Sequence, residues 1–213
     1  VMKAHYNGLI PRNPFIQFHI SPNVKEREYL TEDELKAVMT HEFADSKLAY
    51  IRDIFIFASF TALSFVDIQE LTNDNIVEVN GEKWILSKRH KTKVAFQVKL
   101  LDIPLQIVER YRPMQKDNRI FPGLNYWSIC KPLKRMIREC GITKSISFHC
   151  SRHGFATLAL SKGMPIESVS RVLGHTNIVT TQLYAKITTQ KLDNDLTMFG
   201  DKLSKTFNGI TMS

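Results

Sequence analysis

Residues 147–184 decide the fold, and they read SFHCSRHGFATLALSKGMPIESVSRVLGHTNIVTTQLY. Two apolar helical patterns lie in this stretch. The first ends at Gly163, and the second opens at Pro165 and ends at Gly174, because proline favours a helix start and glycine a helix end. Two helices joined by a short turn are therefore predicted, and the rest of the chain is expected to form a scaffold around their polar side chains.

Four polar side chains of this stretch are candidates for one reactive centre. His149 and Arg152 stand three residues apart at the start of the first helical pattern, near a helix N-terminus that favours an anion. His175 follows Gly174 directly, on a short turn. Tyr184 comes nine residues later, in a polar segment that would leave its hydroxyl accessible. A tyrosine hydroxyl with an arginine and two histidines indicates a nucleophile for phosphoryl transfer.

Three motifs in this stretch resemble the C-terminal signature of the tyrosine recombinases, the phage and transposon integrase family. They read HCSRHGFAT, LGH and TQLY, against the family patterns H-x-x-R-H-x-x-A-T, L-G-H and T-x-x-Y. The resemblance implies that Tyr184 attacks a DNA phosphate, forms a 3′-phosphotyrosyl link and frees a 5′ hydroxyl that later attacks a partner strand. Arg152, His149 and His175 would stabilise charge on the phosphoryl oxygens, and His149 is also a candidate for assisting deprotonation of Tyr184.

An earlier motif departs from the family pattern at one important position. Residues 61–72, TALSFVDIQELT, resemble T-G-L-R-x-x-E/D-hydrophobic-x-x-L, but Ser64 stands where the family has arginine. That arginine binds the scissile phosphate beside the one carried here by Arg152, and serine has neither its charge nor its two-pronged donor geometry. Members from Bacteroidetes mobile elements often lack this arginine, so a resemblance to that branch is expected. Asp67 is expected to be a structural or orienting carboxylate.

Residues 75–101 follow a two-residue period and predict three antiparallel strands. The first two, residues 76–79 and 83–86, would be joined by an Asn80-Gly81 turn, and the third would cover residues 96–100.

The tip between the second and third strands reads KRHKTK. Lys91-Thr92 matches the family's K-T motif, whose lysine protonates the leaving 5′ oxygen, so this role is expected of Lys91. Arg89 lies two residues earlier, and side chains two apart on a strand point to the same side. Arg89 is therefore a candidate substitute for the arginine missing at Ser64, with His90 facing away. A solvated turn arginine or a contact to a flanking phosphate is an equal alternative.

Further helices are predicted on either side of the strands. Thr31 and Glu34 form a capping box for one helix, and a second is expected over about residues 47–63. Another starts at Pro104 with Asp102 as a possible cap, and one over residues 127–140 is kinked or begins near Pro132. Basic residues of this last helix and of the hairpin tip are expected to contact DNA, with a solvated face as the alternative: Arg89, Lys93, Lys131, Lys134 and Arg135.

An amphipathic helix is predicted after Tyr184. Its apolar positions recur every three or four residues: Leu192, Leu196, Phe199, Leu203 and Phe207. The helix can fold onto its own core, or dock on a neighbouring protomer as tails of the resembled family often do. Docking on a neighbour is the outcome we expect.

Composition limits the class of protein and its partners. A chain of 213 residues can bury one sizeable core, and its net charge of +8 favours a polyanionic partner. Its longest apolar run is too short to cross a bilayer, so no membrane partner is expected. The three cysteines lack CxxC spacing, which favours a reducing cytoplasm. Without an acidic two-metal cluster or a phosphate-cradling glycine loop, no metal and no nucleotide cofactor is expected.

The predicted fold is mostly α with a small three-stranded antiparallel sheet, an α+β class that matches the tyrosine recombinase catalytic domain over residues 22–213. Residues 1–21 are expected to be a linker from an N-terminal DNA-binding domain. The resemblance implies a homo-oligomeric, nucleoid-associated recombinase acting on double-stranded DNA. Two alternatives stay open: a catalytically silent DNA-binding relative, motivated by Ser64, and a type IB topoisomerase, which relaxes supercoils without exchanging partners.

Overall fold

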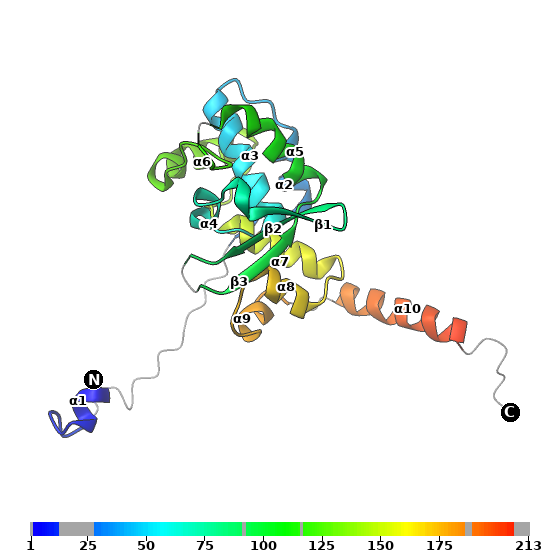
Figure 1. Cartoon of the computed structure of the whole chain (residues 1–213). Helices are drawn as coiled ribbons and strands as arrows, with labels where there is room; N and C mark the ends of the chain where they lie inside the picture. The colour runs from blue at the N-terminus through cyan, green and yellow to red at the C-terminus, as the bar shows by residue number, and fades with distance from the viewer. Residues whose placement is uncertain (1, 13–27, 91–92, 116, 186–188, 207–213) are drawn as a thin grey trace.

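The computed structural model of the chain describes residues 2–12, 28–90, 93–115, 117–185 and 189–206. This described part is mostly helical and contains a three-stranded antiparallel sheet, which confirms the predicted fold class. Figure 1 shows a helical body with the sheet against it and the last helix projecting away. No helix among these residues is long and apolar enough to span a membrane.

A central helix, α3 (Ser46–Thr61), is buried along most of its length in the main core, and it confirms the predicted second helix. It is apolar on nearly every side, as expected for a helix surrounded by others. α2 (Glu32–Thr40) packs on it and begins at the predicted capping box, in which Thr31 and Glu34 bond reciprocally. α3 ends at Ala62, whose φ of 56° is left-handed.

Next, α4 (Phe65–Gln69) and the short 3₁₀ helix η1 (Asn73–Asn75) lead into the sheet. The strands β1 (Ile76–Val79), β2 (Glu82–Lys88) and β3 (Ala95–Lys99) pair in sequence order. Asn80 and Gly81 both have positive φ, at 54° and 78°, so the predicted Asn-Gly turn is confirmed. Ser87 lies opposite Phe96 and Lys88 opposite Ala95, which fixes the register up to the tip.

Two helices follow the sheet: α5 (Asp102–Tyr111), continued by η2 (Arg112–Met114), and α6 (Tyr126–Glu139). The prediction that Asp102 caps α5 is wrong, because the extended Leu101 is the N-cap and Asp102 is already the first helical residue. The carboxylate of Asp102 can still interact favourably with the positive end of the helix dipole there. α6 runs continuously through Pro132, so the helix does not begin there.

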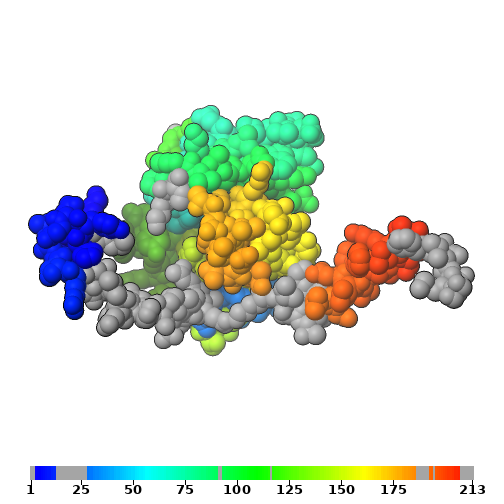
Figure 2. Space-filling view, turned by 90° about the horizontal axis from the view of Figure 1, so that it is seen from below, coloured from blue at the N-terminus to red at the C-terminus, as the bar shows by residue number. Residues whose placement is uncertain are grey.

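The motif stretch folds as predicted into α7 (Cys150–Ser161) and α8 (Ile166–Leu173), followed by the short α9 (Val179–Gln182). Gly163 and Gly174 end the two longer helices with φ of 88° and 62°. In Figure 2 the segment from α7 to α9, yellow to orange, lies at the centre of the face below the green sheet.

The two ends of the chain carry helices of different length. α10 (Thr189–Thr206) confirms the predicted tail helix, although Phe207 lies outside the described residues. Its apolar residues are exposed, Leu192 by 50%, Leu196 by 59% and Phe199 by 58%. α1 (Met2–Tyr6) is a short helix inside the region predicted as an irregular linker.

Aromatic packing connects the main core to the start of α7. Phe148 makes T-shaped contacts with Phe55 of α3 and Phe65 of α4, at 6.0 and 5.3 Å between ring centroids. A second, smaller apolar cluster lies between Ala62, α7 and α8, and Tyr184 packs against it. The predicted reactive side chains therefore sit where the end of α3 meets α7 and α8.

Candidate active site

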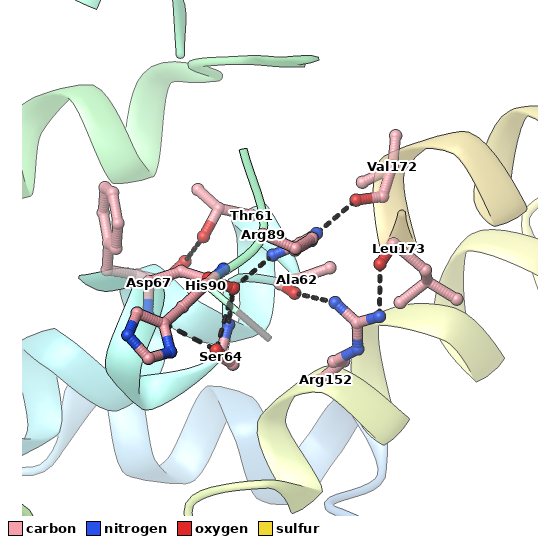
Figure 3. Close-up of polar contacts among 10 residues, drawn as sticks. Thr61, Ala62, Ser64, Asp67, Arg89, His90, Arg152, Val172 and Leu173 are labelled. Atoms are coloured by element: carbon pink, nitrogen blue, oxygen red, sulfur yellow. Dashed lines mark hydrogen bonds and ion pairs between the residues drawn. The ribbon is translucent and has the colours of Figure 1, made fainter. Parts of the chain in front are cut away.

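Arg152 joins the C-terminal ends of two helices. It is 9% exposed, and its Nη1 donates to the carbonyl of Ala62 at 2.9 Å while Nη2 donates to the carbonyl of Leu173 (Figure 3). Carbonyls at helix ends lack intrahelical partners and carry partial negative charge, so they suit a guanidinium. Arg152 is thus fixed from α7 between the ends of α3 and α8.

Arg89 reaches the same place from the hairpin. It is 5% exposed, its Nη1 donates to Asp67 Oδ2 at 2.7 Å, and its Nη2 donates to the carbonyl of Val172 at 2.5 Å. The guanidinium also lies 4.0 Å from the centroid of the Phe96 ring. Figure 3 shows Arg89 beside Arg152 at the end of α8. A solvated turn arginine is therefore ruled out by its burial.

The backbone explains why Arg89 turns inward. Its N–H donates to the carbonyl of Val94 at 2.8 Å, which continues the strand pairing one residue beyond β2. His90 faces away as predicted, because its side chain is exposed and lies 3.3 Å from Glu70. Its backbone N–H turns back to Asp67 Oδ1 at 3.0 Å.

Asp67 connects Arg89 to the position where the family pattern places an arginine. Ser64 is the N-cap of α4, and its Oγ donates to Asp67 Oδ2 at 2.8 Å. Burial opposes ionisation of Asp67, but hydrogen bonds from the His90 backbone, Arg89 and Ser64 outweigh it and hold the pKa of this carboxyl below its usual value. Asp67 is therefore the orienting carboxylate that the sequence predicted.

The charge of Arg89 acts on the neighbouring guanidinium of Arg152. Burial and the nearby charge of Arg89 lower the pKa of Arg152 to about 10, and burial lowers the pKa of Arg89, which Asp67 partly offsets. With a pKa of about 10, Arg152 stays charged at neutral pH. A Cβ atom on Gly174 would lie 2.9 Å from Arg89 Nε, so only glycine leaves the present room. Within the described part of the chain, that Nε is buried and has no hydrogen-bond partner.

His175 is held in its neutral form. Its Nδ1 lies 2.9 Å from the hydroxyl of Thr181, which is fully buried. Burial and the neighbouring Arg152, Arg89 and His149 lower the pKa of His175 to about 4. The neutral ring can accept from Thr181 at one nitrogen and donate from the other.

Tyr184 completes the group. It is half-buried, with its ring 6.5 Å from and nearly parallel to that of His175, and 4.9 Å from that of His153. His149 is the exposed N-cap of α7, and its ring lies 5.1 Å from that of His153. The structure thus brings His149, Arg152, His175, Tyr184 and Arg89 together, whereas Lys91 lies outside the described residues.

Residues 28–191 match the model of the phage integrase family. The chain belongs to the phage integrase family.

Two curated proteins are similar to this chain. Tyrosine recombinase XerA of Pyrococcus horikoshii is 32% identical over 177 residues, which cover 76% of this chain and 58% of that protein. Tyrosine recombinase XerD of Listeria innocua serovar 6a is 26% identical over 204 residues, 88% of this chain and 67% of the relative. The chain therefore spans about three fifths to two thirds of these relatives.

Solved structures share the fold at low identity. The Tn1549 transposon integrase in complex with a circular intermediate DNA gives a TM-score of 0.77 at 17% identity, over 92% of this chain and 74% of that one. The XerH site-specific recombinase in a post-cleavage complex with palindromic difH substrate gives 0.68 at 22% identity, over 85% and 56%.

Apart from Arg89, the predicted DNA contacts of this phage integrase family member lie near the hairpin tip and on α6. Lys93 is exposed near the hairpin tip, with a left-handed φ of 56°. Lys131, Lys134 and Arg135 are exposed on α6. Arg135 also bonds to Glu139 at 2.8 Å and Asp45 at 3.3 Å, which offsets part of its charge. Contact with DNA stays a prediction for all of them.

Several contributors to the site were not predicted from the sequence. His153 directly follows Arg152, and its place in the H-x-x-R-H motif was the available signal. Thr181 is the first residue of the TQLY motif, so a motif signal was available for it as well. The carbonyls of Ala62, Val172 and Leu173 carry no such signal, because they belong to the backbone. No group of three or more His, Cys, Asp or Glu suited to a metal ion occurs among the described residues.

Proposed function

We propose that this chain is the catalytic domain of a tyrosine-type site-specific recombinase, which breaks and rejoins DNA strands through a 3′-phosphotyrosyl intermediate. One observation carries the proposal: two buried arginines, two histidines and a half-buried tyrosine converge from α7, α8, the hairpin and the segment after α9. Membership of the phage integrase family and the Xer relatives support it.

In the proposed reaction, Tyr184 Oη attacks the scissile phosphorus and the bond from phosphorus to the 5′ oxygen breaks. The phenol proton goes to His149, the exposed group at the start of α7, and Lys91 gives a proton to the leaving 5′ oxygen. The freed 5′ hydroxyl of a partner strand then attacks the phosphotyrosyl link and releases Tyr184. Strand joining thus needs no external energy source.

Charge on the phosphoryl oxygens would be stabilised by donors that are already in place. Arg152 supplies one guanidinium, fixed by Ala62 and Leu173. His175 supplies a neutral imidazole, whose Nε2 donates when Nδ1 accepts from the Thr181 hydroxyl. Such preorganised donors lower the barrier because they need no reorientation during the reaction.

Arg89 supplies the second guanidinium in this proposal, in place of the arginine missing at Ser64. The support is its contact with Asp67, the same carboxylate that Ser64 contacts, and its position beside Arg152. This combination also supports assignment to the Bacteroidetes mobile-element branch, with integration or excision of such an element as the biological role.

The wider organisation follows from the same proposal. Residues 22–213 would form the catalytic domain, and residues 1–21 would connect it to an N-terminal DNA-binding domain. The partner would be double-stranded DNA, bound by several copies of the chain. The charge of +8 suits that partner.

Covalent attachment to DNA tests the proposal directly. The substrate is a labelled, nicked duplex carrying a site selected by the protein from random DNA, and the product is a protein–DNA adduct on a denaturing gel. We expect adducts from the wild type and from Tyr126→Phe, a control that removes the hydroxyl of an exposed tyrosine on α6. Tyr184→Phe should form none while its DNA affinity stays nearly unchanged, because only the nucleophilic oxygen is lost.

Other outcomes would contradict the proposal in different ways. An adduct from Tyr184→Phe would show that another residue is the nucleophile. Site-specific binding by the wild type without any adduct would indicate the catalytically silent relative, motivated by Ser64. Relaxation of a supercoiled plasmid without site preference would indicate a type IB topoisomerase.

A further inference from the structure

His153 lies between the start of α7 and Tyr184. It is half-buried, and its ring makes T-shaped contacts with the rings of Tyr184 at 4.9 Å and 74°, and of His149 at 5.1 Å and 75°. His153 directly follows Arg152 on α7. The tyrosine ring therefore contacts the same helix that carries this arginine.

The segment that carries Tyr184 has few buried anchors. Residues 176–180 are exposed, and so are Gln182 and Leu183, which directly precede Tyr184. Thr181 is its buried residue and bonds to His175. Tyr184 itself packs on the small apolar cluster and contacts two imidazole rings, with the parallel His175 ring farther away at 6.5 Å. The ring contact with His153 is the nearer of these two ring contacts and therefore bears on where the phenol points.

We propose that His153 is a positioning residue for Tyr184: its ring holds the phenol against α7, so that the hydroxyl faces a phosphate bound at Arg152. This inference rests on the proposed function, in which Tyr184 is the nucleophile. T-shaped aromatic pairs have a preferred geometry, so the contact restricts the orientation of the phenol as well as its place. A nucleophile displaced by about 1 Å can lose on the order of 10²-fold in rate.

Two substitutions at His153 test whether Tyr184 depends on an aromatic ring at this position or on the ring nitrogens. His153→Ala removes the ring, whereas His153→Phe keeps an aromatic ring and removes both nitrogens. His41→Ala is the matched control, because His41 also contacts an aromatic ring, that of Phe43 at 4.5 Å, outside the site. Each variant is assayed for single-turnover adduct formation on the saturated nicked duplex.

We expect His153→Ala to slow adduct formation about 10- to 100-fold at unchanged DNA affinity. His153→Phe should stay within a few-fold of the wild type, and His41→Ala should match it. A His153→Phe variant as slow as His153→Ala would overturn the inference, because the nitrogens rather than the ring's place would then be required.

A second measurement reads the position of Tyr184 without using activity. The protein is labelled with 3-fluorotyrosine, and the fluorine resonance of Tyr184 is identified by its loss in Tyr184→Phe. We expect this resonance to shift in His153→Ala, where a neighbouring ring current is lost, and to stay unchanged in His41→Ala. An unshifted resonance in His153→Ala would overturn the inference. A wild type that forms no adduct would refute the proposed function alone, and the fluorine resonance would still decide the role of His153.

Discussion

Arg89 and Ser64 both contact the Oδ2 atom of Asp67, so the two residues are linked through one carboxylate. Ser64 caps α4 and contacts Asp67 from that side, while Arg89 reaches the same carboxylate from the hairpin. Strand alternation made Arg89 a candidate to turn toward the site, with a solvated turn arginine as an equal alternative. It could not identify Val172 as a partner, because a backbone carbonyl 83 residues away has no sequence signature.

Removing Arg89 should therefore affect chemistry more than binding. We expect Arg89→Ala to form adducts on the order of 10²-fold more slowly at saturating protein, since a transition-state donor is lost. Its free energy of unfolding should also fall by about 3–5 kcal/mol, because a buried carboxylate loses its ion-pair partner. Single-turnover cleavage and urea unfolding measure the two effects separately.

An arginine placed at position 64 in the Arg89→Ala variant provides the control. Adding Ser64→Arg to Arg89→Ala returns a guanidinium next to Asp67, at a cost of about 1 kcal/mol for the lost helix cap, and should restore part of the cleavage rate. If Arg89→Ala alone cleaves at the wild-type rate, Arg89 does not replace the missing arginine.

His175 should make stability depend on pH. Its pKa is about 4 in the folded chain, against an ordinary value of 6.5. Between these values the unfolded chain binds a proton that the folded chain does not, so the free energy of unfolding falls as the pH drops through this window. We expect a shallower fall in His175→Asn, measured by urea unfolding from about pH 7 to pH 4. His90→Asn controls for the loss of an imidazole, and identical curves for all three proteins would contradict the prediction.

At the scale of elements, local signals predicted most of the fold. The Thr31–Glu34 capping box, the Asn80-Gly81 turn and the helix ends at Gly163 and Gly174 each depend on neighbours a few residues away. Asp102 was misplaced by one residue because Leu101 stays extended. The arrangement of helix ends around Arg152 was beyond such reasoning, since Ala62 lies 90 residues from Arg152.

Two features of the structure require glycine at position 174: the left-handed backbone and the close approach of Arg89. A comparison with Gly141 distinguishes the two. Gly174 and Gly141 both have positive φ, at 62° and 74°, but only a Cβ on Gly174 meets another atom, Arg89 Nε at 2.9 Å. Alanine at either position should cost about 1–2 kcal/mol of stability for the left-handed backbone. We expect Gly174→Ala to lose more than Gly141→Ala and to slow cleavage as well. Equal losses of stability with normal cleavage in both would show that Arg89 can move aside freely.

At the scale of the whole molecule, we predict that α10 docks on a second copy of the chain. Its apolar residues remain exposed in the single chain, Leu196 by 59% and Phe199 by 58%, which suits docking on a second copy. We expect removal of residues 192–213 to weaken binding to paired sites more than binding to a single site, as measured by gel mobility. Removing only residues 207–213 keeps α10 and serves as the control. Equal weakening on both substrates would contradict docking between copies.

The β2–β3 pairing continues through Arg89. The presence of the Arg89 guanidinium in the site therefore depends on the register of the two strands. Side chains alternate along a strand, so a slip of one residue would turn Arg89 outward and bring a neighbour inward. An arginine at the position of Ser64 would be insensitive to such a slip, because it would precede a helix. Hairpins usually accept insertions and deletions readily during evolution. In this chain, single-residue insertions and deletions in β2 before Arg89 should be selected against, while changes of two residues that preserve the alternation remain open to drift.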